Sequence, residues 1–474
     1  MRKKVNLLFP MEILNRELDF RLFQAVKSAR EDARIFIGQY DAIYRAAETM
    51  RNGLYVGKNI RPSREKQSDA SMKMHNRLDT LRERGFRLMH LDEEGAVMAG
   101  EEDRWKQWLL RRLDVCSLDA NEFACTWGDY QRDFYRSLNP PCKDNIQTTG
   151  HPRFDLYKPK NRAFYNADVQ RLKNTYGDYV LINTNFSFVN NRNGSRVSFS
   201  SRFFYGDPAE GSARLDHIHH WAHTSRTLIN FVKLVMRLSI EMPHLNFVIR
   251  PHPSENVNYY KSIFEASKNV YVVHEGSVGP WLLAGKALIH DGCTTAIESH
   301  FCDVPVINYK SERDERYDLM LPNLFGVRCT SEDEVLARLQ NILNAPQTST
   351  QFSSVVQGSA ADTQGGVNDV ARSLIDNFEH DAFEKLTNAI WSAAENIPPS
   401  DAPSLGLGVQ ATYQRWRERI RSRGPRHDNV SGKLDKFAGF SEATTGPKMR
   451  AVQEILDKDV RYTIHSKRLM SVEC

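Results

Sequence analysis

The stretch KALIHDGCTTAIESH, residues 286–300, decides the fold that we expect for this chain. Its apolar residues 287–289 predict a buried strand, which ends at His290. Gly292 then permits a tight turn into a helix. A second apolar run, residues 304–308, follows the helix and completes a strand–helix–strand unit. Such units build parallel sheets with right-handed crossovers.

The turn after the first of these strands is a candidate phosphate-binding site. A helix amino terminus attracts anions because its first N–H groups are unpaired and its dipole is positive there. The hydroxyl groups of Thr294 and Thr295 add further donors. Glu298, one helical turn later, is placed to accept both hydroxyl groups of a ribose. A helix that is merely capped by threonine is the alternative interpretation.

Polar residues also follow two other apolar runs in this half of the chain. The motif RPHPSE begins at Arg250, and its Arg and His can bind a diphosphate or a carboxylate through charge-assisted hydrogen bonds. The motif INTNF begins at Ile182 and ends a strand in small amides. The alternatives are a rigid surface turn for RPHPSE and an Asx turn for INTNF. The candidate ligand-binding residues of this half are Asn183, Thr184, Asn185, Arg250, His252, His290, Gly292, Thr294, Thr295 and Glu298.

Acidic residues follow two expected strands of the first half, residues 5–9 and residues 87–91. The first strand precedes RELD, and the second precedes DEEG. The three acids of DEEG should repel one another, which raises pKa values and can leave one carboxylate as a general base. The alternatives are that the acids of RELD complement a helix dipole and that those of DEEG form a solvated acidic loop. The candidate catalytic acids are Glu12, Glu17, Asp19, Asp92 and Glu93.

Strand-like and helical patterns alternate along the chain twice, over residues 1–158 and over residues 159–346. This alternation predicts an α/β protein with two Rossmann-like, doubly wound domains. A flexible connection and a helical tail are expected over residues 347–474. The expected helices include residues 17–33, 72–84, 224–242, 370–394, 415–423 and 449–458, and residues 190–213 are expected to form a long loop.

The composition excludes several classes of protein. A net charge of +5, without a long basic block, does not indicate nucleic-acid binding. No run of about 18 apolar residues predicts a membrane-spanning helix. The amino terminus begins like a signal peptide, but Pro10 and Glu12 interrupt its apolar run. Seven cysteines without a CxxC pair favour a reduced, cytoplasmic protein. The histidine-rich residues 216–223 lack HExxH, so we expect no metal site.

Six motifs occur in one order along the chain: RELD, DEEG, GHPRFD, INTNF, RPHPSE and HDGCTTAIES. Over about residues 3–345 the chain therefore resembles a bacterial family of surface carbohydrate biosynthesis proteins. The RPHP and DGCTTAIE motifs more distantly resemble the nucleotide half of GT-B glycosyltransferases. Capsule Kdo transferases and CDP-glycerol glycerophosphotransferases share that half.

The resemblance implies a metal-independent glycosyltransferase without a cofactor. A nucleotide-activated donor, for which a CMP-activated, Kdo-like sugar is one candidate, would bind the second domain. A glycan or lipid-linked acceptor would bind the first domain, where Arg16 and Arg153 are candidate contacts and one acid would deprotonate the attacking hydroxyl. The basic helix at residues 415–423 is a candidate peripheral membrane contact, with a solvated face as the alternative. A glycerophosphotransferase, a nucleotide-sugar epimerase and a non-catalytic scaffold are the alternative functions.

Overall fold

The computed structural model describes residues 3–58, 60, 77–95, 98–200, 211–345, 366–401 and 437–474. The chain forms two compact units. Unit 1 contains Met1–Ala96, Lys106–Phe164 and Arg372–Cys474, and unit 2 contains Val97–Trp105 and Tyr165–Ala371. The expected helix at residues 415–423 lies outside the described residues, as does most of the connection at residues 347–366.

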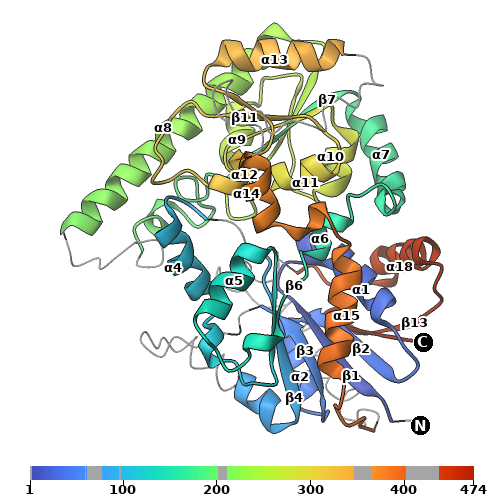
Figure 1. Ribbon diagram of the computed structural model, residues 1–474. Coiled ribbons are helices and arrows are strands. Elements are labelled where there is room, and N and C mark those ends of the chain that lie inside the picture. The colour runs from blue at the N-terminus through green and yellow to red at the C-terminus, as the bar shows by residue number, and fades with distance from the viewer. Residues whose placement is uncertain are drawn as a thin grey trace. The chain divides into compact units, whose positions relative to one another are not determined.

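Unit 1 is built on an eight-stranded sheet with the order β13-β14-β2-β1-β3-β4-β5-β6. The six strands from β1 to β6 pair in parallel, and all seven residues of β1 are buried, as expected for a parallel strand covered on both faces. Figure 1 shows α15 packed along this sheet, where it contacts β3 and β4. The strands are β1 (Val5–Met11), β2 (Ala33–Gln39), β3 (Gly53–Gly57), β4 (Phe86–Leu91), β5 (Phe123–Thr126), β6 (Ile146–Thr148), β13 (Arg461–Ser466) and β14 (Leu469–Glu473).

The helices of unit 1 differ from expectation mainly in the carboxyl-terminal part. The single helix expected at residues 370–394 is wrong, because a 3₁₀ turn at Asp376–Phe378 separates two helices. The first helix is α1 (Leu14–Ser28), which is shorter than predicted, and residues 77–83 of the helix expected at 72–84 are helical. The other helices are α2 (Tyr40–Ala47), α5 (Asp129–Ser137), α6 (Pro152–Asp155), α15 (Ala382–Ala394) and α18 (Glu442–Leu456). Two further helices, α4 (Glu102–Arg112) and α14 (Gly366–Leu374), have residues in both units.

The carboxyl-terminal residues belong to unit 1, which corrects their assignment to a separate tail. Besides the expected helices, they add the β13–β14 hairpin, and β14 pairs antiparallel with β2. Asp155 anchors the carboxyl-terminal residues to unit 1. Its carboxylate accepts hydrogen bonds from Asn377 Nδ2 at 2.8 Å and from the backbone N–H of Ala382 at 2.5 Å. The second contact is at the first residue of α15. Residues more than 200 positions apart thus form one core.

Unit 2 contains a six-stranded sheet in which every pair is parallel, with the order β12-β11-β10-β7-β8-β9. One of its faces packs against α8 and α13 through apolar residues such as Ile182, Leu234 and Leu339. The strands are β7 (Tyr179–Asn183), β8 (Asn246–Arg250), β9 (Val270–Val272), β10 (Ala287–His290), β11 (Val306–Tyr309) and β12 (Val327–Cys329). The helices are α7 (Asn166–Tyr176), α8 (Gly211–Glu241), α9 (Val257–Ile263), α10 (Gly279–Ala284), α11 (Thr295–Phe301), α12 (Met320–Asn323) and α13 (Glu332–Asn344). One mainly parallel sheet and one fully parallel sheet, each flanked by helices, confirm the predicted Rossmann-like α/β class.

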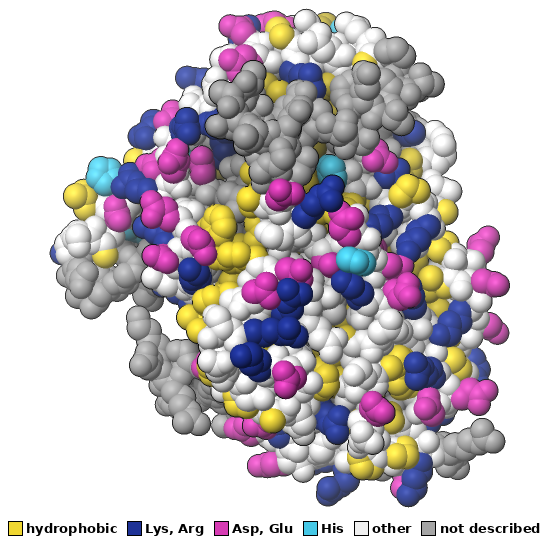
Figure 2. Space-filling model, in the orientation of Figure 1, with side chains coloured by type: hydrophobic (Ala, Val, Ile, Leu, Met, Phe, Trp, Pro, Cys, Tyr) yellow, Lys and Arg dark blue, Asp and Glu magenta, His cyan; other side chains and the backbone are white. Residues whose placement is uncertain are grey.

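Helix α8 begins 13 residues earlier than the helix expected at residues 224–242. The expected loop at 190–213 is therefore shorter, and it contains a 3₁₀ turn at Ser195–Val197. Among the helices of the described residues, none combines the length and apolar character needed to cross a bilayer. Figure 2 shows acidic and basic side chains interspersed over the face that it displays, without one large basic area.

Candidate functional site

Four neighbouring strands of unit 2 end in polar side chains that lie side by side. Arg250 of β8 is in register with Asn183 of β7, and Asn183 is in register with His290 of β10. His290 is in turn in register with Asn308 of β11. Strands in register are about 4.8 Å apart, and paired residues lie on one face of a parallel sheet. We call these four residues the polar row.

Three members of the polar row carry buried polar atoms that find no hydrogen-bond partner among the described residues. These atoms are Asn183 Oδ1, His290 Nε2 and Asn308 Oδ1. The Nδ1 atom of His290 accepts a hydrogen bond from the N–H of Cys293 at 3.2 Å, so we place the ring proton on Nε2. Burial lowers the pKa of His290 to about 3, so the ring is neutral. Buried polar groups are rarely left unpaired, and the row thus offers two acceptors and a donor to a ligand.

The guanidinium group of Arg250 is held in place at one end of the row. It donates to the carbonyl oxygens of Glu275 at 2.6 Å and Gly276 at 3.1 Å, and it lies 4.9 Å from the ring centre of Trp281. Burial lowers the pKa of Arg250 to about 10, which still leaves it cationic at neutral pH. Its positive charge is therefore fixed at the carboxyl edge of the sheet.

Glu255 connects the two polar loops that follow β7 and β8. Its buried carboxylate accepts hydrogen bonds from Thr184 Oγ1 at 2.8 Å, from the His252 N–H at 3.0 Å and from Tyr260 Oη at 2.5 Å. Burial raises the pKa of Glu255. His252 Nδ1 also accepts from the N–H of Ser254 at 3.2 Å, whereas Asn185 is partly exposed. Thr184 and the backbone of His252 therefore shape the loops, and Glu255, their common partner, was not among the predicted site residues.

The turn between β10 and α11 has the expected form, with Gly292 at a φ of 64°. Helix α11 is only seven residues long, and the Thr294 side chain makes no capping hydrogen bond. Thr295 Oγ1 is buried and finds no partner among the described residues, and the side chain of Glu298 is buried one turn later.

A lysine that the sequence analysis overlooked lies at the end of β11. Lys310 forms ion pairs with Asp291 and, at 3.1 Å, with Asp318. It lies two residues after Asn308 of the polar row and is itself buried. A second cation therefore lies close to the row.

The acids of RELD in unit 1 are engaged in structural contacts. Glu17 accepts hydrogen bonds from the N–H groups of Glu12 at 2.9 Å and Ile13 at 3.3 Å, and it pairs with Lys58 at 3.2 Å. Its side chain is 1% exposed, so it holds the start of α1. Asp19 pairs with Lys448 of α18 at 2.6 Å. Neither arrangement leaves a carboxylate open to a substrate.

The prediction that the acids of DEEG raise one another's pKa is wrong. Burial alone would raise the pKa of Asp92 and of Glu94, but Arg112 beside Asp92 and Arg16 beside Glu94 lower both. Arg112 Nε lies 2.8 Å from Asp92 Oδ2, and Arg16 lies 3.0 Å from Glu94. These acids are ionised members of ion pairs, and Arg16, a candidate acceptor contact, is occupied by them.

Glu93 lies in a fully buried cluster of charged and aromatic side chains. Burial alone would raise the pKa of Glu93, but His151, together with Lys58 and Arg21, lowers it. His151 Nε2 lies 3.2 Å from Glu93 Oε2, and burial lowers the pKa of His151 to about 4. Arg153, the other candidate acceptor contact, is buried and donates to the Glu93 carbonyl oxygen at 3.4 Å. Glu93 is thus inaccessible to a substrate, and so is Arg153.

Glu12 is the exception among the five candidate acids. Its side chain is 43% exposed, and it lies one residue beyond the carboxyl end of β1. Lys58 pairs with it at 3.0 Å and also with buried Glu17, so the carboxylate of Glu12 is fixed beside a cation. Glu12 is therefore the one candidate base that a substrate can approach.

The histidines of α8 pack against aromatic rings. His220 stacks between Phe188 and Tyr317, with ring centres 4.6 and 4.3 Å away, and burial lowers its pKa to about 4. His217 Nε2 lies 2.7 Å from the carbonyl oxygen of Ser198. Within the described residues, no group of three or more His, Cys, Asp or Glu side chains is arranged to hold a metal ion.

Comparison with known proteins gives matches only among solved structures. No protein-family model matches the sequence, and no curated protein matches it. The UDP-GlcNAc 2-epimerase from Neisseria meningitidis bound to UDP-GlcNAc is 10% identical, with a TM-score of 0.47, over 82% of this chain and 100% of that chain. The wall teichoic acid polymerase TagF is 10% identical, with a TM-score of 0.47, over 83% and 90%. S. aureus MnaA with UDP is 12% identical, with a TM-score of 0.45, over 85% and 100%. These values are too low to assign an activity or a ligand to this chain.

Proposed function

We propose that this chain is a glycosyltransferase of the GT-B type that acts in the synthesis of a bacterial surface polysaccharide. It would transfer a sugar from a nucleotide-activated donor to a glycan or lipid-linked acceptor at the cytoplasmic side of the membrane. The observation that carries the proposal is the polar row of unit 2. Its unpaired buried atoms lie at the carboxyl edge of a parallel sheet, which is where α/β proteins bind their ligands.

The chemistry of the row and its surroundings suits a nucleotide donor. Arg250 would supply positive charge for a diphosphate, and Lys310, held between Asp291 and Asp318, lies nearby. His290 supplies a neutral N–H donor, and the Thr295 hydroxyl group lies at the start of α11. Glu298, in the first turn of α11, would accept hydrogen bonds from the hydroxyl groups of a ribose. Positive charge at this edge would also stabilise the phosphate that leaves during transfer, without a step that requires a metal.

Unit 1 would supply the acceptor side of the reaction through Glu12. A general base must reach the proton that it removes, and Glu12 is the exposed member of the candidate acids. Lys58 pairs with Glu12 at 3.0 Å and would hold its carboxylate in position. Glu12 would deprotonate the attacking hydroxyl group of the acceptor.

A nucleotide-release assay tests the proposal. The purified full chain is incubated with CMP-Kdo, with CDP-glycerol and with UDP-, GDP- and dTDP-sugars, each with and without a membrane-extracted glycan acceptor. A glycosyltransferase releases nucleotide from a sugar donor only when the acceptor is present. Release from CDP-glycerol would instead indicate glycerophosphate transfer, and conversion of a donor sugar without an acceptor would indicate an epimerase. A chain that processes none of these donors would be a scaffold.

Replacing Glu298 with glutamine should weaken binding of the selected nucleotide by about 10- to 100-fold. The substitution removes a charged acceptor, and hydrogen bonds to charged groups contribute about 1.5–3 kcal/mol each. Titration calorimetry of the purified variant checks this expectation. Glu265, an exposed residue of the same unit, gives the matched control, and Glu265→Gln should bind normally. Equal affinity of both variants would show that Glu298 does not contact the nucleotide.

A further inference from the structure

Helix α8 carries an apolar stripe on the side opposite to its buried face. The helix packs into unit 2 through residues such as Leu228, Phe231 and Leu238. Because successive residues turn by about 100°, a second set falls within about 40° of a line on the opposite side. This stripe consists of Leu215, Ile218, Ile229, Met236 and Ile240. Its isoleucines and leucine are among the most exposed large apolar side chains of the described residues, with Ile240 70% and Leu215 58% exposed.

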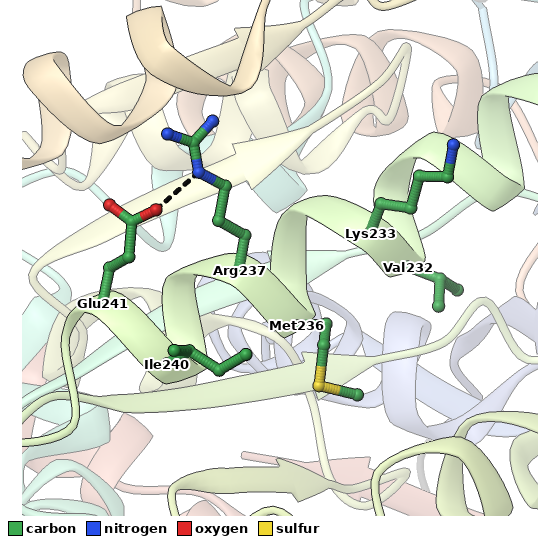
Figure 3. Close-up of a pocket in the computed structure, with 6 residues that line it drawn as sticks. All are labelled: Val232, Lys233, Met236, Arg237, Ile240 and Glu241. Carbon is green, nitrogen blue, oxygen red and sulfur yellow. Dashed lines mark hydrogen bonds and ion pairs between the residues drawn. The ribbon is translucent and has the colours of Figure 1, made fainter.

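The carboxyl-terminal part of the stripe borders an open groove of ≈ 480 Å³. Figure 3 shows the charged side chains of Lys233, Arg237 and Glu241 along one edge of this groove and the apolar side chains along the other. Arg237 Nε donates to Glu241 at 2.6 Å. An apolar surface with a charged border suits a partner that has a charged outer layer over an apolar interior.

The basic residues of α8 beside the stripe are Arg226 and Lys233. Both lie within about 60° of its centre line and are exposed, and Arg226 also pairs with Glu312 at 3.1 Å. The two acidic residues of α8 lie more than about 100° away from that line, and each is in an ion pair, Asp216 with Arg316 and Glu241 with Arg237. The stripe is therefore bordered by cations and separated from the carboxylates of its own helix.

We infer that the outer face of α8 docks onto the surface of an anionic phospholipid bilayer. The apolar stripe would enter the boundary between headgroups and acyl chains, while Arg226 and Lys233 would contact lipid phosphates. The stripe extends over about 38 Å of straight helix, which suits a flat surface. Figure 1 shows the amino-terminal part of α8 extending beyond the sheet of its own unit. Docking of a second copy of this chain through the same face is disfavoured, because the cations of the two copies would repel each other. This inference does not depend on the proposed transferase activity.

Vesicle flotation of the full chain tests the docking. Vesicles of phosphatidylcholine with about 30% phosphatidylglycerol should bind the protein, vesicles of phosphatidylcholine alone should bind it weakly, and salt should reduce binding. The double variant Ile229→Ser, Ile240→Ser should bind about tenfold or more weakly, and Lys233→Glu more than about fivefold more weakly. Matched controls are Leu110→Ser on α4 and Arg171→Glu on α7, which also change exposed side chains and should bind normally.

Because the substituted side chains are exposed, all these variants should melt at the temperature of the unmodified chain, which checks that they fold. Vesicle binding that is absent, or that is the same in the α8 variants and the controls, would overturn the inference. A third outcome would also overturn it. The unmodified chain would not bind vesicles but would form a concentration-dependent dimer that the double variant does not form, since the stripe would then bind a second copy.

Discussion

Replacing Glu12 with glutamine should lower kcat for sugar transfer by about 10²- to 10⁴-fold, which is the range that a general base contributes. The substitution keeps the size of the side chain and removes its ability to take up a proton. Donor binding should stay unchanged because Glu12 belongs to unit 1, whereas the polar row belongs to unit 2. Because the side chain is partly exposed, the melting temperature should change little. Steady-state kinetics with the donor that the release assay identifies gives the comparison.

Glu94 supplies the matched control for this experiment. It is a partly exposed acid of unit 1 that is paired with an arginine at 3.0 Å, so Glu94→Gln also breaks an ion pair without removing the proposed base. Its kcat should stay within a few-fold of the unmodified chain. The pH–rate profile adds a second test, because the acidic limb should disappear in Glu12→Gln alone. If both variants lose activity equally, or if Glu12→Gln retains full kcat, Glu12 is not the base.

Replacing Asp155 with alanine should lower the free energy of unfolding of unit 1 by about 3–5 kcal/mol, the cost of breaking a buried charged network. The Asp155 carboxylate is fully buried, where it pairs with Lys158 at 2.6 Å and accepts from Asn377 and the start of α15. The substitution leaves these donors without their acceptor. Urea unfolding followed by tryptophan fluorescence measures the change.

The matched control is Asp168→Ala, because Asp168 is a largely exposed acid on α7 whose arginine partner lies 3.6 Å away. An exposed pair contributes at most about 1 kcal/mol, so this variant should be close to normal. Hydrogen exchange should accelerate in α15 of Asp155→Ala and nowhere in the control. If α15 stays protected in Asp155→Ala, Asp155 does not anchor the carboxyl-terminal residues to unit 1.

The strands with continuous apolar runs could be predicted from the sequence. The expected strand at residues 5–9 is the start of β1, and that at 287–289 lies within β10, because a parallel strand that is buried on both faces reads as an uninterrupted apolar run. The carboxyl-terminal strands β13, at the edge of the sheet, and β14, between β13 and β2, could not be found this way. Their place depends on pairing with β2, more than 400 residues earlier in the chain, and β13 alternates in burial like an ordinary surface segment.

The position of the candidate site could also be predicted, but not the state of its side chains. Polar residues after apolar runs correctly located Asn183, Arg250 and His290 at one sheet edge. Applying the same rule to residues 304–308 would have added Asn308. The acids of unit 1 were misjudged because their partners are distant in sequence. Arg112 and Lys58 form ion pairs with them, His151 lies beside Glu93, and no local pattern connects these residues to the acids.

The most direct test of the central claim is a thermal-shift panel. It measures the melting temperature of the full chain with CMP, CDP, UDP, GDP, ADP and dTDP, each added separately. A nucleotide at about 100 times its Kd should stabilise the folded chain by about 2.7 kcal/mol. We expect one nucleotide to raise the melting temperature selectively, and the double variant Asn183→Ala, Asn308→Ala to melt normally but to lose that shift. No shift with any nucleotide in a folded sample, or an equal shift in the double variant, would contradict the assignment of the polar row as a nucleotide-binding site.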